Sequence, residues 1–185
     1  DNNDDTSFST ARAGSKAEYM YGRGNLERHT KLPKGFAWRF RAQGQIADGN
    51  LQSSEQLGLG GYSTVRGYDE RESNGDAGFI VSNEIHFPAF SPGRLIDPEA
   101  IDRAVFLAFY DYGQVEPHDI PATVAGMDSH VIMESVGLGF RYSISKNLSI
   151  RFDYGWQLRN SGILTGPAGP RPNSSRGHVS ATMSF

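Results

Sequence analysis

Glu55-Gln-Leu-Gly-Leu-Gly-Gly-Tyr-Ser-Thr-Val-Arg-Gly-Tyr68 is the most distinctive stretch of the chain, and Asp69-Glu-Arg-Glu-Ser-Asn-Gly-Asp76 follows it directly. A segment of this length is far too long for a hairpin turn. Backbone angles that are closed to other residues are open to its glycines, Gly58, Gly60, Gly61 and Gly67. Two interpretations remain: an ordinary glycine-rich surface loop, or a loop that folds back onto polar surface so that Arg66 can bind a carboxylate.

Alternating apolar and polar residues predict β-strands on both sides of this loop. In 148–159, every second residue is apolar or aromatic, and the residues between them are polar or glycine. Side chains two residues apart share one face of a strand, so the two faces differ in polarity. The same period predicts antiparallel strands at 16–28, 35–47, 78–87, 104–115, 135–143, 148–159 and 177–185, although 104–115 is apolar on both faces. Residues 1–14 are expected to be a polar segment or loop, and 15–185 one β-rich domain that contains the loop 51–76.

Strand length and aromatic content favour a membrane barrel over a soluble fold. The expected strands of about 9–13 residues match a tilted bilayer crossing, whereas soluble strands are usually shorter. The best strands place Trp and Tyr on one face and Arg, Asp and Gln on the other, which is typical of a lipid-facing surface and a polar lumen. A soluble β-sandwich that acts as a binding module has the same period and remains the alternative of another class.

Composition and spacing argue against several other classes. The chain has no cysteine, which removes disulfides and cysteine zinc sites, and its net charge of −3 argues against nucleic-acid binding. Its five histidines lack the spacing of metal ligands. Gly61-Tyr-Ser63 lacks the closing glycine of a nucleophile elbow. We therefore predict no catalytic residue, no metal site and no cofactor.

A second motif makes the pattern specific. Phe109-Tyr-Asp-Tyr-Gly113 has the form Phe-x-Asp-x-Gly, and together with Val65-Arg-Gly-Tyr68 it resembles the outer-membrane polypeptide-transport superfamily, which includes BamA, TamA and the TpsB transporters. The details are most similar to two-partner secretion transporters of the ShlB/FhaC/HecB type, the haemolysin secretion/activation proteins. This resemblance implies a sixteen-stranded transmembrane β-barrel with periplasmic POTRA domains before it. The chain would be its all-β C-terminal part, about seven antiparallel strands with open edges, and the long loop would fold into the lumen.

The resemblance also implies a function. A transporter of this type secretes a large unfolded exoprotein, haemolysin-like or adhesin-like and of the TpsA kind, across the outer membrane of a Gram-negative bacterium. Its partners would be this exoprotein, outer-membrane lipid and the barrel-assembly machinery, whose C-terminal signal Phe185 resembles. A BamA/TamA-like barrel insertase or surface antigen is the alternative within the superfamily. A passive porin has no reason to carry both motifs.

Site residues follow from the same resemblance. In the family the loop arginine pairs with the aspartate of the strand motif, here Arg66 with Asp111, flanked in that motif by Phe109 and Gly113. Val65, Gly67 and Tyr68 belong to the loop motif, with Gly60 and Gly61 before them.

The residues alone leave the partner of Arg66 open. Glu84, Glu134 and Asp153 are rivals of Asp111, and Asp153-Tyr-Gly155 repeats the Asp-x-Gly spacing. A guanidinium confined in a lumen needs a carboxylate, because a single buried charge is costly. The side chains expected to line the lumen are Glu84, Arg141, Arg151 and Asp153, together with Arg39, Arg41 and Arg159.

Overall fold

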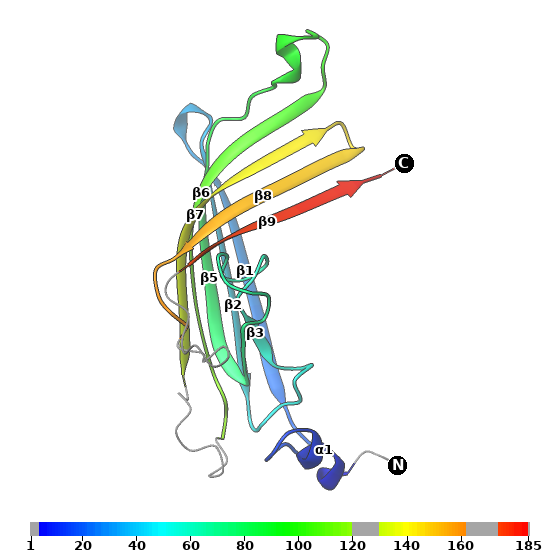
Figure 1. Ribbon diagram of the computed structural model, residues 1–185, viewed down its shortest axis with the longest axis vertical. Helices are drawn as coiled ribbons and strands as arrows, with labels where there is room; N and C mark the ends of the chain where they lie inside the picture. The colour runs from blue at the N-terminus through cyan, green and yellow to red at the C-terminus, as the bar shows by residue number, and fades with distance from the viewer. Residues whose placement is uncertain (1–3, 120–129, 162–173, 185) are drawn as a thin grey trace.

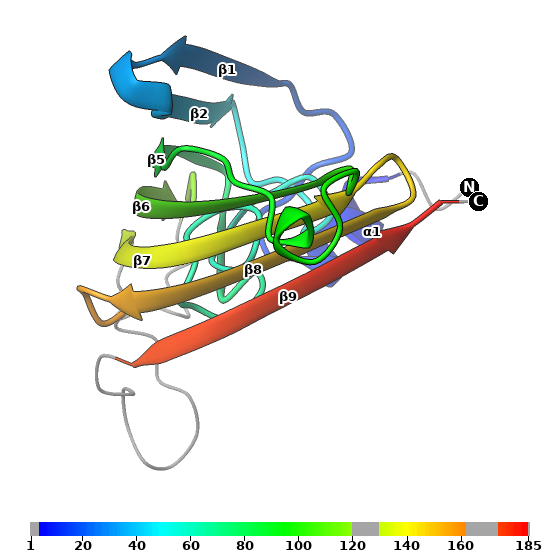
Figure 2. The same cartoon turned by 90° about the horizontal axis from the view of Figure 1, so that it is seen from above.

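The computed structural model describes residues 4–119, 130–161 and 174–184. Its main element is one antiparallel sheet in the order β1-β2-β5-β6-β7-β8-β9 (Figure 1). The strands are β1 (Tyr21–Lys31), β2 (Ala37–Ala47), β5 (Ala77–His86), β6 (Asp102–Glu116), β7 (Val131–Ile144), β8 (Leu148–Gln157) and β9 (Ser175–Met183). Viewed from above, the sheet is curved, and β1 and β9 are edges that do not meet (Figure 2).

The predicted all-β fold of about seven antiparallel strands is confirmed, but the first strand is displaced. It was expected at 16–28 and forms at Tyr21–Lys31, where it pairs with β2 from Tyr21↔Ala47 to Lys31↔Ala37. The tight connection lies at Pro33–Gly35, in which Lys34 and Gly35 both have positive φ. Pairing with the strongly alternating β2 therefore sets the register, and the weak pattern of β1 follows it.

The two faces of the sheet differ in what covers them. We call the face that carries loop 51–76 the inner face and the opposite one the outer face. The outer face exposes large apolar side chains, among them Phe79, Ile85, Phe106, Leu138, Phe152, Trp156 and Val179. In the described part of the chain no second large sheet packs on this surface, so the aromatic faces do not form the core of a β-sandwich. None of the described helices is long and apolar enough to cross a membrane, a finding that concerns helices only.

Loop 51–76 lies on the inner face and supplies four of the seven residues of the hydrophobic core (Figure 2). Within it, β3 (Leu57–Leu59) and β4 (Ser73–Gly75) form a small antiparallel hairpin. The core brings together four loop residues and three sheet residues, Leu57, Leu59, Val65, Tyr68, Ile80, Val115 and Met133. Because these side chains leave water only when loop and sheet meet, their burial favours the docked loop.

The N-terminal segment contains a short helix. Residues 1–14 were expected to be a polar segment or loop, and within them Asp5–Ala11 form the helix α1, near one end of the sheet (Figure 1). Asp4 caps it by accepting a hydrogen bond from the backbone N–H of Ser7 at 2.8 Å. After the helix, Arg12 donates two hydrogen bonds to Asp76, at 2.6 and 2.7 Å. A seven-residue helix is too short to show a period, and this distant contact holds it in place.

Candidate functional site

The guanidinium of Arg66 is fully buried between loop and sheet, and all of its donors are used. Nε and Nη2 donate to the two oxygens of Asp111 at 2.7 and 2.8 Å. Nη1 donates to Glu84 at 2.7 Å and to Asp153 at 3.3 Å, and Nη2 also donates to the hydroxyl of Ser82 at 3.2 Å. A guanidinium carries five N–H groups, so none is left without a partner.

The sequence left four carboxylates as candidate partners, and the structure brings three of them to Arg66. Asp111 makes the bidentate contact, while Glu84 and Asp153 bind the remaining amino group. Glu134 is not among these contacts, because Ser135 is the residue opposite Asp111 and the side chain of Glu134 lies on the outer face, where it accepts from Tyr110. The alternatives are therefore not exclusive: one cation is shared by carboxylates on β5, β6 and β8.

Ion pairs around Arg66 join three guanidinium groups to three carboxylates, and the guanidinium of Arg41 lies close enough to interact with Glu84 and Asp111 as well. Asp153 also accepts from Arg141 at 2.9 Å and from Arg151 at 2.8 Å, so three guanidinium groups face three carboxylates. Burial by itself would lower the pKa of Arg66, but the hydrogen bond and charge of Asp111 and the charges of Glu84 and Asp153 raise it above its ordinary value. The loop arginine is thus permanently charged. A buried ion pair of this kind fixes geometry more reliably than it adds stability.

Each residue of the Phe-x-Asp-x-Gly motif contacts the loop. The motif residues alternate along β6, so Phe109, Asp111 and Gly113 share the inner face. The ring of Phe109 lies 3.5 Å from the guanidinium carbon of Arg66, a cation–π contact. A Cβ at Gly113 would come within 2.3 Å of Leu59, so glycine is what allows the loop to approach this strand. In this motif, Phe109 contacts the guanidinium with its ring, Asp111 neutralises its charge, and Gly113 leaves space for the loop.

The second Asp-x-Gly triplet is used in the same way, one strand beyond β7. Asp153 binds Arg66, and a Cβ added to Gly155 would lie 2.8 Å from backbone atoms of Arg66 and Gly67. Between the two triplets, Gly137 leaves room for the ring of Phe109, which a Cβ there would approach within 2.2 Å. On the inner face under the loop, three glycines on neighbouring strands, Gly113, Gly137 and Gly155, leave space for the loop, and Asp111 and Asp153 beside them bind Arg66.

The glycines of the loop motif adopt backbone angles that other residues disfavour. Gly60, Gly61 and Gly67 have φ of +99°, +102° and +96°. At Gly67 this angle turns the chain directly after Arg66, and its N–H donates to His178 at 3.3 Å. Its carbonyl accepts from Gln157 at 2.8 Å, so the loop tip also contacts β8 and β9.

Val65 and Tyr68, on either side of Arg66 and Gly67, are both fully buried in the core beneath the loop. The hydroxyl of Tyr68 accepts from the backbone N–H of Glu134 at 3.1 Å and donates to the carbonyl of either Arg159 or Glu134. Burial comes first among the causes that raise the pKa of Tyr68 above its ordinary value. This side chain therefore remains a neutral hydrogen-bond donor.

Some functional contacts could not be found from the sequence. Ser82 supports Asp111 by donating to it at 2.6 Å, and its place on the inner row of β5 was the available signal. His178, Gln157 and the pair of Arg12 with Asp76 gave no signal, because their partners are far away in the chain. Phe185, expected to be the assembly signal, lies outside the described residues. Over the described ranges no cluster of potential ligands could hold a metal ion.

Known proteins resemble this chain over most of its length. A family model described as haemolysin secretion/activation protein ShlB/FhaC/HecB matches residues 2–141, a range that includes both Arg66 and Asp111. The chain belongs to this family. The matched range ends within β7. Asp153, Gly155 and His178 lie beyond it, so their contacts with loop 51–76 come from the structure of this chain and not from the family match.

Two similar curated relatives of this ShlB/FhaC/HecB member bear the name heme/hemopexin transporter protein HuxB. They come from Haemophilus influenzae strain 86-028NP and strain KW20 / Rd, and each is 31% identical over 133 residues, which cover 70% of this chain. The same match covers 22% of each relative, so the chain spans about a fifth of their length.

Proposed function

We propose that this chain is part of an outer-membrane transporter that secretes a large unfolded exoprotein by two-partner secretion. Family membership supports the transporter class. The exposed apolar outer face supports contact with lipid, because a sheet in a bilayer turns such side chains outward. The curvature and open edges of the sheet support its being a section of a larger, sixteen-stranded barrel (Figure 2).

One observation carries this proposal: Arg66, at the tip of a long loop, is buried against acidic side chains of three strands on the inner face. In a closed barrel that face is the lumen, so the loop would stand in the path of anything that crosses. Loop and wall are joined by ion pairs, hydrogen bonds and a small apolar core, all reversible contacts. The lumen would be obstructed at rest and opened by moving the loop, without a step that needs ATP.

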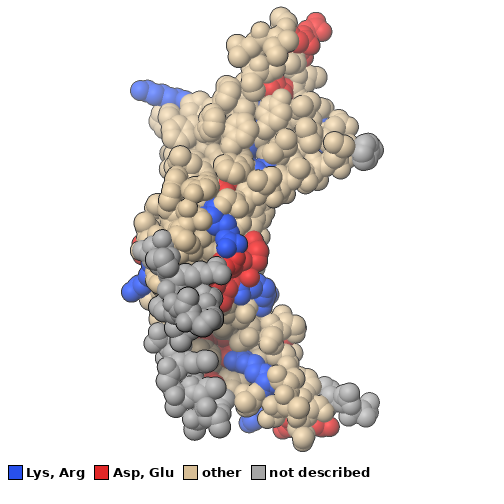
Figure 3. All heavy atoms as spheres, viewed as in Figure 1, with Lys and Arg blue, Asp and Glu red and all other residues tan. Residues whose placement is uncertain are grey.

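The surface around the loop fits such a passage. In the space-filling view one side of the molecule is hollowed, and basic and acidic side chains gather together around the middle of it (Figure 3). Charges of both signs that neutralise each other leave little net field, so an unfolded chain of mixed composition would meet no strong electrostatic barrier.

The test begins by deleting the full-length transporter in its own bacterium and identifying which protein disappears from the culture medium. The variant Arg66→Ala, expressed in the deletion strain, should lose most of this export while its barrel still inserts, as judged by heat-modifiable migration in gels. Arg71→Ala removes an exposed arginine of the same loop and should export normally. Normal export by Arg66→Ala would refute the role of the contact. Loss of other outer-membrane barrels in the deletion strain, with no secreted protein missing, would favour an insertase instead.

A further inference from the structure

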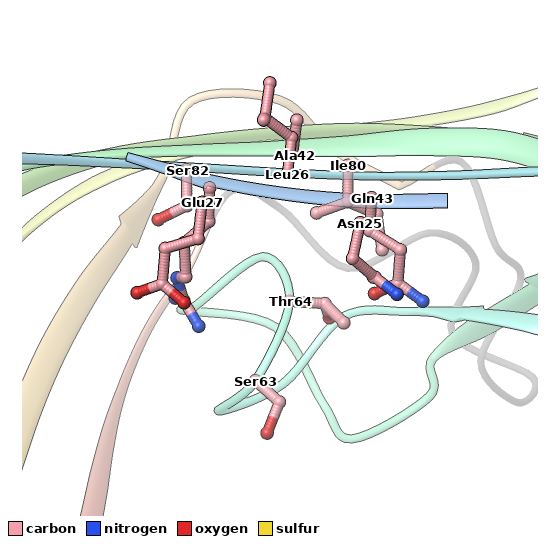
Figure 4. A pocket seen from close by; sticks show the side chains of 10 residues that line it. Asn25, Leu26, Glu27, Ala42, Gln43, Ser63, Thr64, Ile80 and Ser82 are labelled. Atoms are coloured by element: carbon pink, nitrogen blue, oxygen red, sulfur yellow. The ribbon is translucent and has the colours of Figure 1, made fainter. Parts of the chain in front are cut away.

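The loop leaves an open groove on one side. The cavity, of about 250 Å³, lies between loop residues Ser63 and Thr64 and the inner face of β1 and β2 (Figure 4). Both polar and apolar side chains line it: the polar residues are Asn25, Glu27, Arg41, Gln43, Ser63, Thr64 and Ser82, and the apolar ones are Leu26, Ala42 and Ile80. Figure 4 shows Asn25 and Gln43 side by side on the strand wall and Ser63 on the loop opposite.

The far side of the loop has no such space. There the backbone of Arg66 and Gly67 lies so close to Gly155 that a Cβ would meet it at 2.8 Å. Arg151 closes the same side, with its guanidinium carbon 3.8 Å from the ring of Tyr62. Among the described residues the loop tip around Arg66 is thus attached to β5, β6 and β8, and the groove separates it from β1 and β2. The base of the loop does reach these two strands: Tyr21 and Arg23 donate to Glu55, and Gln45 donates to Glu55 and Asp76.

The groove contains polar atoms without partners. Only three buried side-chain nitrogen or oxygen atoms in the described ranges make no hydrogen bond, and two of them, Arg41 Nε and Thr64 Oγ1, belong to groove residues. A buried polar group without a partner is destabilising, so both atoms favour a ligand that can bond to them. One is a donor, and the hydroxyl can donate or accept.

Polar residues also lie beyond the cavity on both strands, where Arg23 and Gln45 donate to the backbone carbonyl of Glu55 and close the groove at that end. The register of β1 with β2 sets Arg23 opposite Gln45, Asn25 opposite Gln43 and Glu27 opposite Arg41. Because the period is two, all of these residues lie on the inner face. Glu27 is bound by Arg39 at 2.6 Å and by His29 at 2.7 Å. Arg23 and Arg41 lie on the same face, so the wall is polar with an excess of basic charge.

From these observations we propose that the groove between Ser63–Thr64 and the β1–β2 wall is the site where an extended segment of the exported polypeptide lies during passage. Each residue of an unfolded chain presents a backbone donor and an acceptor that need partners away from bulk water. Asn and Gln side chains offer both, so such a wall pairs with a backbone of almost any sequence. The loop tip then remains attached to β5, β6 and β8, while the base of the loop moves away from β1 and β2 and releases the bonds at Glu55 as the polypeptide passes. This inference rests on the proposed secretion function.

Cysteine cross-linking tests the position of the polypeptide. The described chain has no cysteine of its own, so single cysteines can be placed in a cysteine-free version of the full-length transporter. Gln43→Cys and Asn25→Cys report on the groove, and Ser180→Cys, on the inner face of β9, is the matched control. The probe is the secreted protein that the deletion strain fails to export, stalled by a stably folded C-terminal domain and carrying one cysteine. We expect a disulfide to form with the two groove positions and not with Ser180→Cys.

Ser63→Trp supplies a second measurement. Ser63 is exposed and lines the groove, so an indole there should fill it and abolish export with the loop still docked. Ser54→Trp, at another exposed serine of the loop, should export normally.

Cross-links that form equally well from Ser180→Cys while export proceeds would refute the proposed position of the polypeptide in the groove and leave the secretion function intact. Normal export by Ser63→Trp would have the same meaning. If deleting the transporter removes no protein from the medium, the secretion function fails and the groove fails with it.

Discussion

Replacing Arg66 by alanine should release the loop from the inner face. The change removes every hydrogen bond of the guanidinium and leaves Asp111 and Glu84 buried, at 0% and 2% exposure, without their cation. Removing one partner of a buried ion pair costs about 3–5 kcal/mol. Since 1.36 kcal/mol corresponds to a factor of ten, the ratio of docked to released loop should fall by roughly 200-fold to 5,000-fold.

Thiol labelling measures this ratio directly. Val65 is fully buried by the docked loop, so the thiol of a Val65→Cys reporter reacts with a maleimide only after release. When the loop opens and closes faster than it reacts, the labelling rate follows the released fraction. Arg66→Ala in this background should raise the rate by the factor above, until the rate of a free thiol is reached.

Arg71→Ala is the matched control, because Arg71 is exposed and donates only to the backbone carbonyls of Ser53 and Gln56. These bonds are made by a side chain exposed to water and leave no buried charge behind, so their loss should change labelling by no more than about tenfold. Equal labelling rates for Arg66→Ala and Arg71→Ala would refute the idea that the buried charge cluster holds the loop.

Three further substitutions probe other contacts of the loop. Gly155→Ala forces a Cβ against loop backbone and should raise reporter labelling by about tenfold or more, as overpacking costs about 1–3 kcal/mol, whereas Gly177→Ala on β9 meets only side-chain atoms at 3.6 Å and should not. Tyr68→Phe leaves the backbone N–H of Glu134 without its acceptor and should lower the midpoint of thermal unfolding of the purified barrel. The aromatic ring stays in the core, so the apolar packing is unchanged. Arg12→Ala should make the segment around α1 sensitive to limited proteolysis, because Asp76 is left buried without its cation. Burial would raise the pKa of Asp76, but Arg12 and the N–H groups of His118 and Leu51 hold this pKa below its ordinary value. In the unsubstituted protein, protection of the α1 segment against proteolysis should therefore be complete above the ordinary pKa of an aspartate. It should be lost as the pH falls through the lower pKa that Asp76 has in the folded state. Proteolysis that does not depend on pH in the acid range would contradict this last expectation.

The sheet could be predicted from the sequence where alternation was strong. β8 and β5 were expected at 148–159 and 78–87, and they form within two residues of those limits. β1 was misplaced because its glycines and charged residues carry little alternation, and its limits depend on pairing with β2. The hairpin of β3 and β4 and the helix α1 were missed because elements of three to seven residues are too short to establish a period.

At the site, the sequence indicated which residues carry charge but not how many would meet. The contact of Arg66 with Asp111 was expected from the resemblance of two motifs, whereas Glu84 and Asp153 stood as rivals. A linear pattern gives the face on which each carboxylate lies, but the curvature of the sheet determines that carboxylates of β5, β6 and β8 converge on one point. The contact of Gly67 with His178 depends on the same curvature.

The sharing of one guanidinium among β5, β6 and β8 has a mechanical consequence. A residue bonded to three strands at once is sensitive to the spacing between them, because its planar fork tolerates only small displacements of its acceptors. If the wall flattens or widens at this level, the bonds cannot all be kept, and the tip of the loop loosens. A change in membrane tension that widens the barrel wall would then also increase the fraction of released loop.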